Sequence, residues 1–522
     1  MSLESPRRAD VIVVGAGSAG AVVARRLADA GRDVLVVEAG PHRDEPAVDD
    51  PARMHELWDS PLDWSFRTVP QEHADQRRLH LPRGRVVGGS HALNAMIWVR
   101  GNPADYDHWA ALGNEGWSWR DVQPLFARVD GLGTETPGTL DVLMGYEPDD
   151  VQRSIVEATR QAGLPFNPDY NGVRQDGVSF MQFTIRDGRR LTTASAYLAP
   201  VLERGAGAGA GAGADVGVGV GVTLVADANV RRLLFEGRRC VGVEWSRGGA
   251  AERAYADEVV LCAGAIGSPV LLMRSGIGDA DALGGAVAHV PGVGRNLQDH
   301  WLVPVIASVD RAPAFTPGLP QTQSHLFWRS RPDLQLPDLQ PLHFGVPLYE
   351  PWMEGPPNGV SLMAGLVRPA SHGQIRLATD PWDAPLIDPR VLSDSDEADL
   401  DALGAAVRLC QQIIDATELR DTWGARELYP GPLAESTRDL HAYIRRSVVT
   451  YHHQAGTCKM GVDDAAVVDP QLRVHGVEGL RVADASIMPA VPTGNTNAPA
   501  IMIAERAADL LTAPVTASAA PA

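Results

Sequence analysis

Short β-branched runs alternate with helix-type segments at the start of the chain. Val11–Val14 is an uninterrupted apolar run, suited to a strand that is buried on both faces. Ala21–Ala30 has apolar residues at helical spacing and is followed by Gly31, and Val34–Val37 is a second buried strand. The order of strand, helix and strand predicts a βαβ unit of a parallel sheet.

The same pattern returns near the carboxyl end, where Leu480–Ala483 predicts a short strand and Ala498–Leu511 a helix. Between residues 301 and 450, several alternating apolar segments, including Gln374–Ala378, accompany helices around 396–416 and 436–447. We therefore expect an α/β and α+β protein. The segments between residues 301 and 450 predict a second, mixed domain that contains a substantial sheet.

A glycine motif stands at the turn between the first strand and the first helix. Gly15 permits the tight turn, Gly17 lets the backbone approach a pyrophosphate, and Gly20 lets helix and strand pack closely. The helix amino terminus offers N–H groups and partial positive charge to phosphates. Glu38, 18 residues beyond Gly20, is placed to bind a ribose hydroxyl and would repel a 2′-phosphate. Both FAD and NAD fit this stretch.

Two further stretches carry polar or flexible groups. The turn Gly88-Gly89-Ser90 allows close backbone approach to a ligand, and Asn94 follows with an amide that donates and accepts, although a structural turn fits equally. We expect residues 41–80 to form an extended surface excursion, in which Trp64 either faces a cofactor or packs as an ordinary tryptophan. The three tryptophans of residues 102–130 indicate core packing.

Residues 205–222 alternate Gly with Ala or Val, which predicts a flexible insertion without chemistry. We predict a disordered tail at residues 513–522.

The composition of the chain limits the kinds of binding partner and the cellular location that we expect. The net charge of −19 argues against nucleic acid or an anionic membrane surface. Four dispersed cysteines without a C-x-x-C pair make a zinc site or disulfide framework unexpected, so we predict no metal site and a reducing, cytoplasmic location. We see no segment suited to a transmembrane helix. No motif encodes an oligomeric state.

Five separated blocks resemble one family. They are the fingerprint at 15–38, GRVVGGSHALNAM at 84–96, AGAIGSPVLLMRSGIG at 263–278, PGVGRNLQDH at 291–300, and HQAGTCKMG with DASIMPAVPTGNTNAPAIMIAE near the end. Together they resemble the glucose–methanol–choline (GMC) flavin oxidoreductases, closest to the choline-dehydrogenase-like branch. The likeness covers nearly the whole chain in the family's order.

The resemblance implies a discontinuous Rossmann-like FAD-binding domain and a substrate domain with a substantial antiparallel sheet. We predict FAD-binding segments at 1–140 and 195–300, substrate-domain segments at 141–194 and 301–450, and a closing catalytic segment at 451–512. The resemblance implies catalytic residues His453 and Asn495. It also implies, together with the glycine motif, these cofactor-binding residues: Gly15, Gly17, Ser18, Ala19, Gly20, Glu38, Ala39, Trp64, Val87, Gly89, Ser90, Asn94, Ala95, Met96, Val230, Asp484, Ala485, Asn495 and Thr496.

The implied reaction is oxidation of a small-molecule alcohol to an aldehyde or ketone, with hydride transfer to flavin N5. Imidazole suits the proton acceptor because its ordinary pKa is near neutrality, and Asn495 would orient the alkoxide. His452 is the rival base; if the segment is extended, only one of the two histidines faces the flavin. Oxygen or another electron acceptor would reoxidise the flavin.

Two positions depart from the family pattern. His91 stands where many members carry a small residue, which would alter the surroundings of the flavin. Leu93 stands where members with covalently attached flavin carry histidine, so we expect non-covalent FAD.

Three alternatives stay open. An NAD-dependent dehydrogenase explains the first 40 residues but not the carboxyl-terminal block. A flavin lyase or photodecarboxylase on the same scaffold would bind FAD without net alcohol oxidation. A non-catalytic flavoprotein would bind FAD and never be reduced by substrate. The presence of both His453 and Asn495 favours oxidation over the last two.

Overall fold

The valine-rich strands near the amino terminus lie in the middle of an eight-stranded sheet. Strand β1 (Arg7–Val14) lies between β2 (Val34–Val37) and β12 (Ala250–Leu261) and is parallel to both. Strand β9 (Val222–Val225) continues the parallel set beyond β2. All four residues of β2 are buried, which explains why its sequence shows no alternation. The computed structural model describes residues 7–42, 45–134, 138–205, 218–219 and 221–513.

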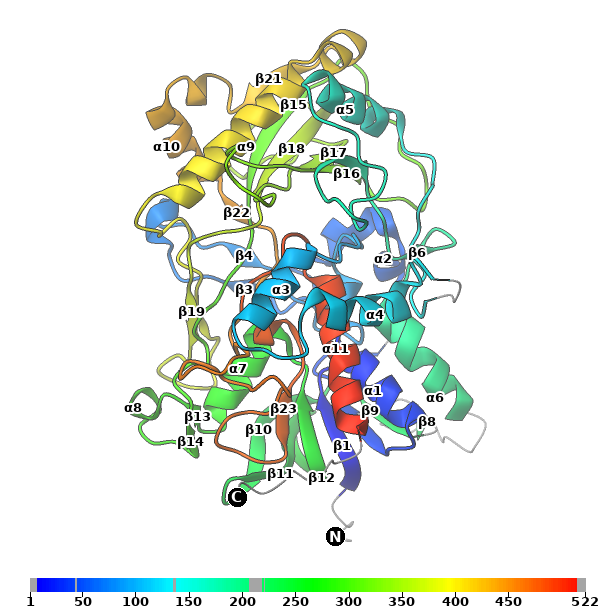
Figure 1. Cartoon of the computed structure of the whole chain (residues 1–522), viewed down its shortest axis with the longest axis vertical. Coiled ribbons are helices and arrows are strands. Elements are labelled where there is room, and N and C mark those ends of the chain that lie inside the picture. Colours follow the sequence, from blue (N-terminus) through cyan, green and yellow to red (C-terminus); the bar gives the residue numbers. More distant parts are fainter. Residues whose placement is uncertain (1–6, 43–44, 135–137, 206–217, 220, 514–522) are drawn as a thin grey trace.

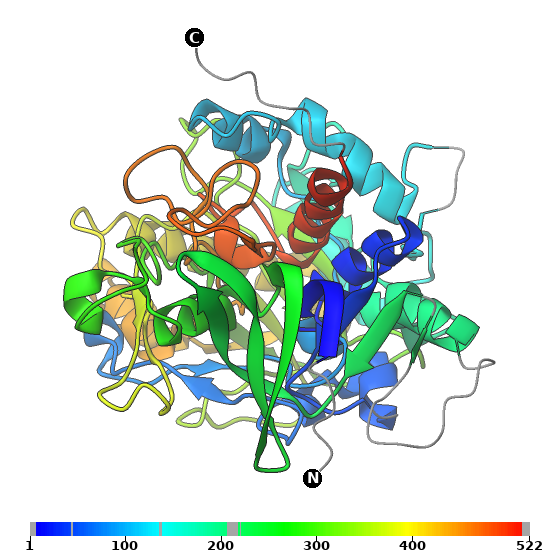
Figure 2. The same ribbon diagram turned by 90° about the horizontal axis from the view of Figure 1, so that it is seen from below.

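The carboxyl-terminal part of the chain returns to this sheet. Strand β23 (Leu480–Val482) pairs in parallel with β12, and helix α11 (Asn497–Thr512) packs beside α1 (Gly20–Asp29). Figure 1 shows these two helices, blue and red, next to one another, and Figure 2 shows the sheet from below. The antiparallel strands that complete the sheet are β8 (Val218–Gly219), β10 (Asn229–Glu236) and β11 (Arg239–Arg247).

A second sheet of seven strands is antiparallel throughout. Its strands are β5 (Gly177–Phe180), β15 (Trp301–Ser308), β16 (Thr322–Phe327), β17 (Leu342–Phe344), β18 (Gly359–Leu366), β21 (Arg426–Tyr429) and β22 (Val449–Thr450). The helices that pack against it are α5 (Asp150–Gln161), α9 (Ala398–Ile414) and α10 (Thr437–Ser447), in the upper part of Figure 1. The predicted fold class is confirmed, while the predicted domain boundaries stay a prediction.

Shorter elements connect the two sheets. The remaining helices are α2 (Pro46–Asp49), α3 (Pro103–Ala111), α4 (Trp119–Asp130), α6 (Ala199–Gly205), α7 (Gly264–Arg274) and α8 (Ala280–Leu283). Small strand pairs are β3 (Phe66–Arg67) with β4 (His80–Leu81), β6 (Ile185–Arg186) with β7 (Arg189–Arg190), β13 (Ile277–Gly278) with β14 (Ala288–His289), and β19 (Gln374–Arg376) with β20 (Leu386–Asp388). Among the described residues, no helix has both the length and the apolar character needed to cross a membrane.

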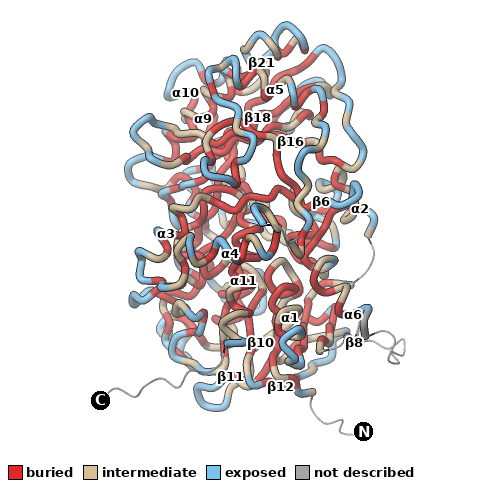
Figure 3. The backbone as a smooth tube through the Cα atoms, turned by 45° about the vertical axis from the view of Figure 1, so that its right-hand side comes forward, coloured by how far each residue is buried: buried red, intermediate tan, exposed pale blue. Residues whose placement is uncertain are grey.

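Buried residues run through the interior of both sheet layers, and exposed residues gather at the rim (Figure 3). Trp109 and Trp117 are fully buried in the larger core, as their expected packing role requires. All four cysteines are buried free thiols. The Gly/Ala-rich insertion at 205–222 and the tail at 513–522 lie mostly outside the described residues.

Parts of residues 41–80, which we expected to form a surface excursion, are buried. Leu57 and Leu62 pack in a buried cluster with Leu93, while Ala74 belongs to the core of the antiparallel sheet. These apolar residues are separated by prolines and polar residues, so neither helical nor strand periodicity reveals them. The segment lies between the two sheets and borders the cavity described next.

Candidate active site

The glycine motif forms the turn between β1 and α1. Gly15 has φ +98°, and a Cβ there would lie 2.6 Å from the Cys262 carbonyl oxygen. A Cβ on Gly20 would lie 1.8 Å from the Gly15 oxygen, so only glycine allows helix and strand to pack this closely. Gly17 faces Gly89, whose Cα lies 3.6 Å from an added Cβ. These contacts leave the turn open toward a cavity.

The cavity measures about 1660 Å³ and extends from the glycine turn to the antiparallel sheet. Small-molecule sites usually measure roughly 300–1,000 Å³, so this one has room for a dinucleotide and a second ligand. Three helix amino termini border it, those of α1, α7 and α11, and none is capped by the side chain of its own N-cap residue. Such termini present N–H groups and partial positive charge, which favours an anionic or electron-rich ligand.

Almost all predicted site residues border this one cavity. They are Gly15, Gly17, Ser18, Ala19, Glu38, Ala39, Trp64, Gly89, Ser90, Asn94, Ala95, Met96, Val230, His453, Asp484, Ala485, Asn495 and Thr496. Gly20 and Val87 do not border it. Gly20 lies behind the turn, and the Val87 side chain packs against the larger core.

Glu38 lies at the end of β2, where its carboxylate ties the glycine turn to the next loop. Its Oε2 accepts from the Ala16 N–H at 2.8 Å, and its Oε1 accepts from the Gly40 N–H at 2.8 Å. Burial raises the pKa of Glu38 to about 7, although these backbone hydrogen bonds by themselves lower it. The carboxylate borders the cavity and has further acceptor capacity for a ribose hydroxyl.

Asp484 holds the amino terminus of α7. Its Oδ2 accepts from the Gly264 N–H at 2.8 Å and from the Ser268 hydroxyl at 2.6 Å. Burial raises the pKa of Asp484, and these hydrogen bonds oppose the shift. Gly264 has open space where a Cβ would be, so its backbone is accessible from the cavity.

His453 and Asn495 meet at the other end of the cavity. Asn495 Nδ2 lies 3.2 Å from His453 Nε2, and His453 Nδ1 lies 2.9 Å from Nδ1 of His300. Gln340 Nε2 donates to Asn495 Oδ1 at 3.0 Å, which directs the Asn495 amino group toward His453. The amino group can only donate, so Nε2 of His453 accepts and its ring proton is on Nδ1.

The surroundings keep His453 neutral. Burial, and then the neighbouring His300, His452 and Arg83, lower the pKa of His453 well below its usual value. Burial and the charge of Arg368 likewise lower the pKa of His300 to about 3. The Val367 carbonyl acts in the opposite direction and raises this pKa. A neutral imidazole with its lone pair directed at Asn495 is poised to accept a proton.

Asp299 fixes the two histidines relative to one another. Its Oδ1 accepts from the backbone N–H of His300 at 2.9 Å and of His453 at 2.8 Å. Its Oδ2 accepts from the Thr450 hydroxyl and the Gln454 amide. Burial raises the pKa of Asp299 to about 6, although these hydrogen bonds by themselves lower it. The buried carboxylate therefore sets the backbone geometry on which the pair depends.

His452 occupies a different environment from the one expected for an extended segment. Its backbone has φ +67°, so it does not alternate with His453 as in a strand, and both histidines border the cavity. Its ring contacts Trp58 edge-on at 5.0 Å, and its carbonyl accepts from Arg83. Asn495 therefore bonds to His453, and His452 packs against an indole.

His91 faces away from the cavity. Its Nδ1 accepts from the Thr193 N–H at 3.2 Å, and its Nε2 lies 3.1 Å from the Thr184 hydroxyl. Burial and Arg190 lower the pKa of His91 to about 3. Leu93, by contrast, borders the cavity and offers only an apolar side chain.

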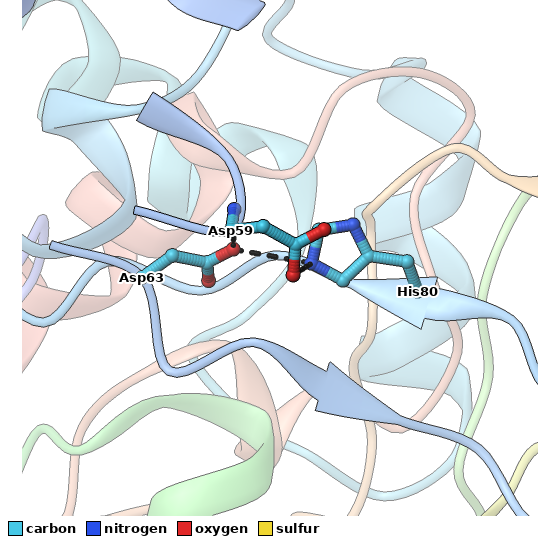
Figure 4. A group of neighbouring side chains, drawn as sticks. All are labelled: Asp59, Asp63 and His80. Carbon is cyan, nitrogen blue, oxygen red and sulfur yellow. Dashed lines mark hydrogen bonds and ion pairs between the residues drawn. The ribbon is translucent and has the colours of Figure 1, made fainter. Parts of the chain in front are cut away.

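Asp59, Asp63 and His80 form a group whose ligand atoms lie within 4.8 Å of one another (Figure 4). Both oxygens of Asp59 are paired with Arg67 at 2.9 Å. Asp63 accepts from the Ser65 backbone N–H and from His80. Burial would raise the pKa of Asp63, but its hydrogen bonds lower it to about 2. These donors already satisfy the carboxylates, so the group holds the 59–83 segment together beside the cavity.

The sequence analysis did not identify three residues that contact the predicted catalytic pair or its backbone: Asp299, His300 and Gln340. The motif PGVGRNLQDH contains the first two and was recognised only as a block of the family likeness. Gln340 stands in an irregular segment before β17 and has no sequence signal. Contacts between residues more than 150 positions apart bring these groups to His453 and Asn495.

Comparison with known proteins identifies the family of the chain. Two family models, both described as GMC oxidoreductase, match residues 9–302 and 369–504. The mitochondrial choline dehydrogenase of Mus musculus is 39% identical, with 96% of this chain and 89% of that protein covered. The alcohol dehydrogenase [acceptor] of Pseudomonas putida is 36% identical, with coverage of 96% and 95%. The crystal structure of pyridoxine 4-oxidase from Mesorbium loti is 33% identical with a TM-score of 0.87, covering 96% of this chain and 98% of that one. The chain therefore belongs to the GMC oxidoreductase family.

Proposed function

We propose that this protein uses non-covalently bound FAD to oxidise an alcohol to the aldehyde or ketone, with His453 as the base and Asn495 orienting the alkoxide. The observation that carries the proposal is the 3.2 Å approach of Asn495 Nδ2 to His453 Nε2 at the border of the cavity. An alcohol oxygen beside these two atoms can give its proton to Nε2 and accept a hydrogen bond from Nδ2. The related choline and alcohol dehydrogenases support alcohols as substrates.

The residues bordering the cavity fit FAD. Gly17 and Gly264 leave backbone room at two helix amino termini, which suits a pyrophosphate, and Glu38 suits a ribose. Asn94–Met96 and the amino terminus of α11 also border the cavity and would hold the ring system. Leu93 offers no nucleophile for covalent attachment, and both ring nitrogens of His91 are already in hydrogen bonds. When bound, FAD would accept the hydride from the alcohol carbon.

The protein's own groups supply the proton chemistry. Neutral His453 takes the hydroxyl proton at Nε2, because its other nitrogen already donates to His300. Asn495 stabilises the charge that develops on oxygen, and Gln340 keeps its amino group pointed there. The NAD alternative does not account for the carboxyl-terminal residues that build this pair.

Anaerobic flavin reduction across a panel of alcohols tests the proposal. Replacing His453 with Ala should slow reduction by roughly 10²–10⁴-fold. Replacing Asn495 with Ala should slow it by roughly 10²–10³-fold. Flavin content should be unchanged in both variants.

His452→Ala is the matched control, since it removes an adjacent, half-buried imidazole that contacts Trp58. A larger loss for His452→Ala than for His453→Ala, at equal flavin content, would reverse the assignment. Failure of every alcohol to bleach the flavin would favour the lyase or photodecarboxylase reading.

A further inference from the structure

One face of the antiparallel sheet forms an apolar wall of the cavity. Leu302, Leu342 and Met363 border the cavity and belong to one apolar cluster. Met363 and Leu342 are directly paired across β18 and β17. The alternate residues Val303 and Leu362 instead belong to the core beneath the helices. Because successive side chains of a strand point to opposite faces, the sheet presents leucine and methionine to the ligand.

This wall adjoins the catalytic pair. Leu302 is two residues beyond His300, whose ring contacts His453 at 2.9 Å, so its side chain follows that of His300 on one face of the chain. Leu302 also pairs with Val449, which borders the cavity four residues before His453. The pairing of Leu302 with Val449 therefore connects the apolar wall to the segment that carries His453.

Three of the four acidic residues that border the cavity have other partners, and the fourth, Asp383, is exposed. Among the described residues they are Glu38, Glu350, Asp383 and Asp484. Glu38 and Asp484 hold backbone amides at the nucleotide end. Glu350 faces Arg77, with its Oε2 4.0 Å from Nη1. Asp383 lies with Trp382 and Arg274 at the exposed edge. The bordering arginines are Arg67, Arg77, Arg78, Arg83, Arg231 and Arg274.

Several aromatic faces that would suit a cation already have one. The Arg446 guanidinium lies 3.9 Å from the ring centre of Trp352, and that of Arg85 lies 5.3 Å from Trp64. The ring of Tyr451 stacks on His453 at 4.5 Å. A quaternary ammonium group would therefore meet positive charge beside the indoles of Trp352 and Trp64. No free carboxylate borders the cavity beside His453 among the described residues.

We propose that the substrate is an uncharged alcohol with an apolar tail held by the wall of Leu302, Leu342 and Met363, and that quaternary ammonium alcohols are poor substrates. The inference rests on the proposed alcohol oxidation and specifies its substrate class. Transfer of an apolar tail from water to this wall is favourable. A fixed cation would instead lose its hydration without gaining a compensating negative charge.

Two alcohols of the same shape test the proposal with the FAD-loaded enzyme. Choline and 3,3-dimethylbutan-1-ol differ at one atom, a quaternary nitrogen in place of a quaternary carbon. In anaerobic stopped-flow reduction, we expect the neutral alcohol to have a second-order rate constant on the order of 100-fold higher. Reduction by choline at an equal or higher rate overturns the substrate class. Reduction by neither, nor by any alcohol of a wider panel, refutes the alcohol oxidation itself.

Binding without turnover gives a second readout. Ethyltrimethylammonium and 2,2-dimethylbutane repeat the same pair of shapes without a hydroxyl group. We expect only the hydrocarbon to perturb the flavin absorption spectrum. A perturbation by the ammonium ion alone contradicts the proposal.

The role of Leu302 is tested by substitution. Leu302→Glu should shift the preference toward choline by at least tenfold, on the order expected when a buried cation gains a carboxylate partner. Leu302→Gln, with nearly the same size and no charge, should leave the preference unchanged. An equal shift in both variants, with normal flavin content, shows that charge at this position does not set the preference. If neither variant retains flavin, the wild-type comparison still decides the substrate class.

Discussion

The hydrogen bond between His300 and His453 makes the strongest quantitative prediction. Removal of its acceptor by His300→Leu leaves the proton on His453 Nδ1 buried without a partner. An unsatisfied buried donor costs about 1–3 kcal/mol. Because 1.36 kcal/mol corresponds to a factor of ten, the tautomer that presents a free Nε2 should be depleted roughly 5- to 150-fold. Flavin reduction should slow by the same factor.

The assay is anaerobic stopped-flow reduction at saturating alcohol, with flavin content measured for each variant. His300→Gln provides rescue, since its amide oxygen can accept from Nδ1, and should recover most of the rate. His343→Leu is a matched control. His343 is equally buried, its pKa is also lowered to about 3 by burial, and its Nδ1 bonds to Ser324 instead of the catalytic pair. The His343→Leu variant should therefore show the wild-type rate of flavin reduction.

The pH profile separates this role from a merely structural one. His300 is among the groups that lower the pKa of His453. Its loss should therefore raise the pKa of His453, so that the base becomes protonated, and activity is lost, at higher pH than in the wild type. A wild-type rate and an unshifted acid limb in His300→Leu would refute the reasoning.

Three further predictions follow from the site. Gly17→Val places a β-branched side chain at the glycine turn and should abolish FAD retention, measured as visible absorbance per protein; normal flavin content would sink the pyrophosphate assignment. Acid precipitation should leave the yellow colour in the supernatant, because Leu93 cannot bond to the flavin; a coloured pellet would show covalent attachment. Wild-type reduction should keep its rate as the pH falls through 6.5, since burial holds the pKa of His453 below that value and the neutral form is the base. A half-loss of rate at pH 6.5 or above would contradict this.

Elements of both sheet layers were predictable where their signals are local. The strand Val34–Val37 has the predicted bounds, and α9 (Ala398–Ile414) lies within two residues of the predicted 396–416. A buried parallel strand shows up as a continuous apolar run, and a long helix by its period. Glu38 and the glycine turn lie within one βαβ unit, so their approach needed no long-range contact.

The catalytic surroundings were not predictable in the same way. The family likeness pointed to His453 and Asn495, but their partners His300 and Gln340 come from distant segments. Strand alternation alone could not tell which face of β15 borders a cavity and which lies beneath helices. His452 illustrates the limit, because its positive φ breaks the alternation that was used to separate it from His453.

The catalytic pair depends on contacts between the two sheet layers. Asn495 immediately precedes α11, which packs beside α1 in the nucleotide layer, whereas Asp299 and Gln340 lie beside strands of the antiparallel sheet. The bond from Gln340 to Asn495 and the bond from Asn495 to His453 both cross this boundary. A small shift of one layer against the other would break the amide orientation that fixes the tautomer of His453. Close packing between the layers is therefore a condition of the proposed proton chemistry, and the proposed base, FAD-binding residues and apolar wall all border the cavity.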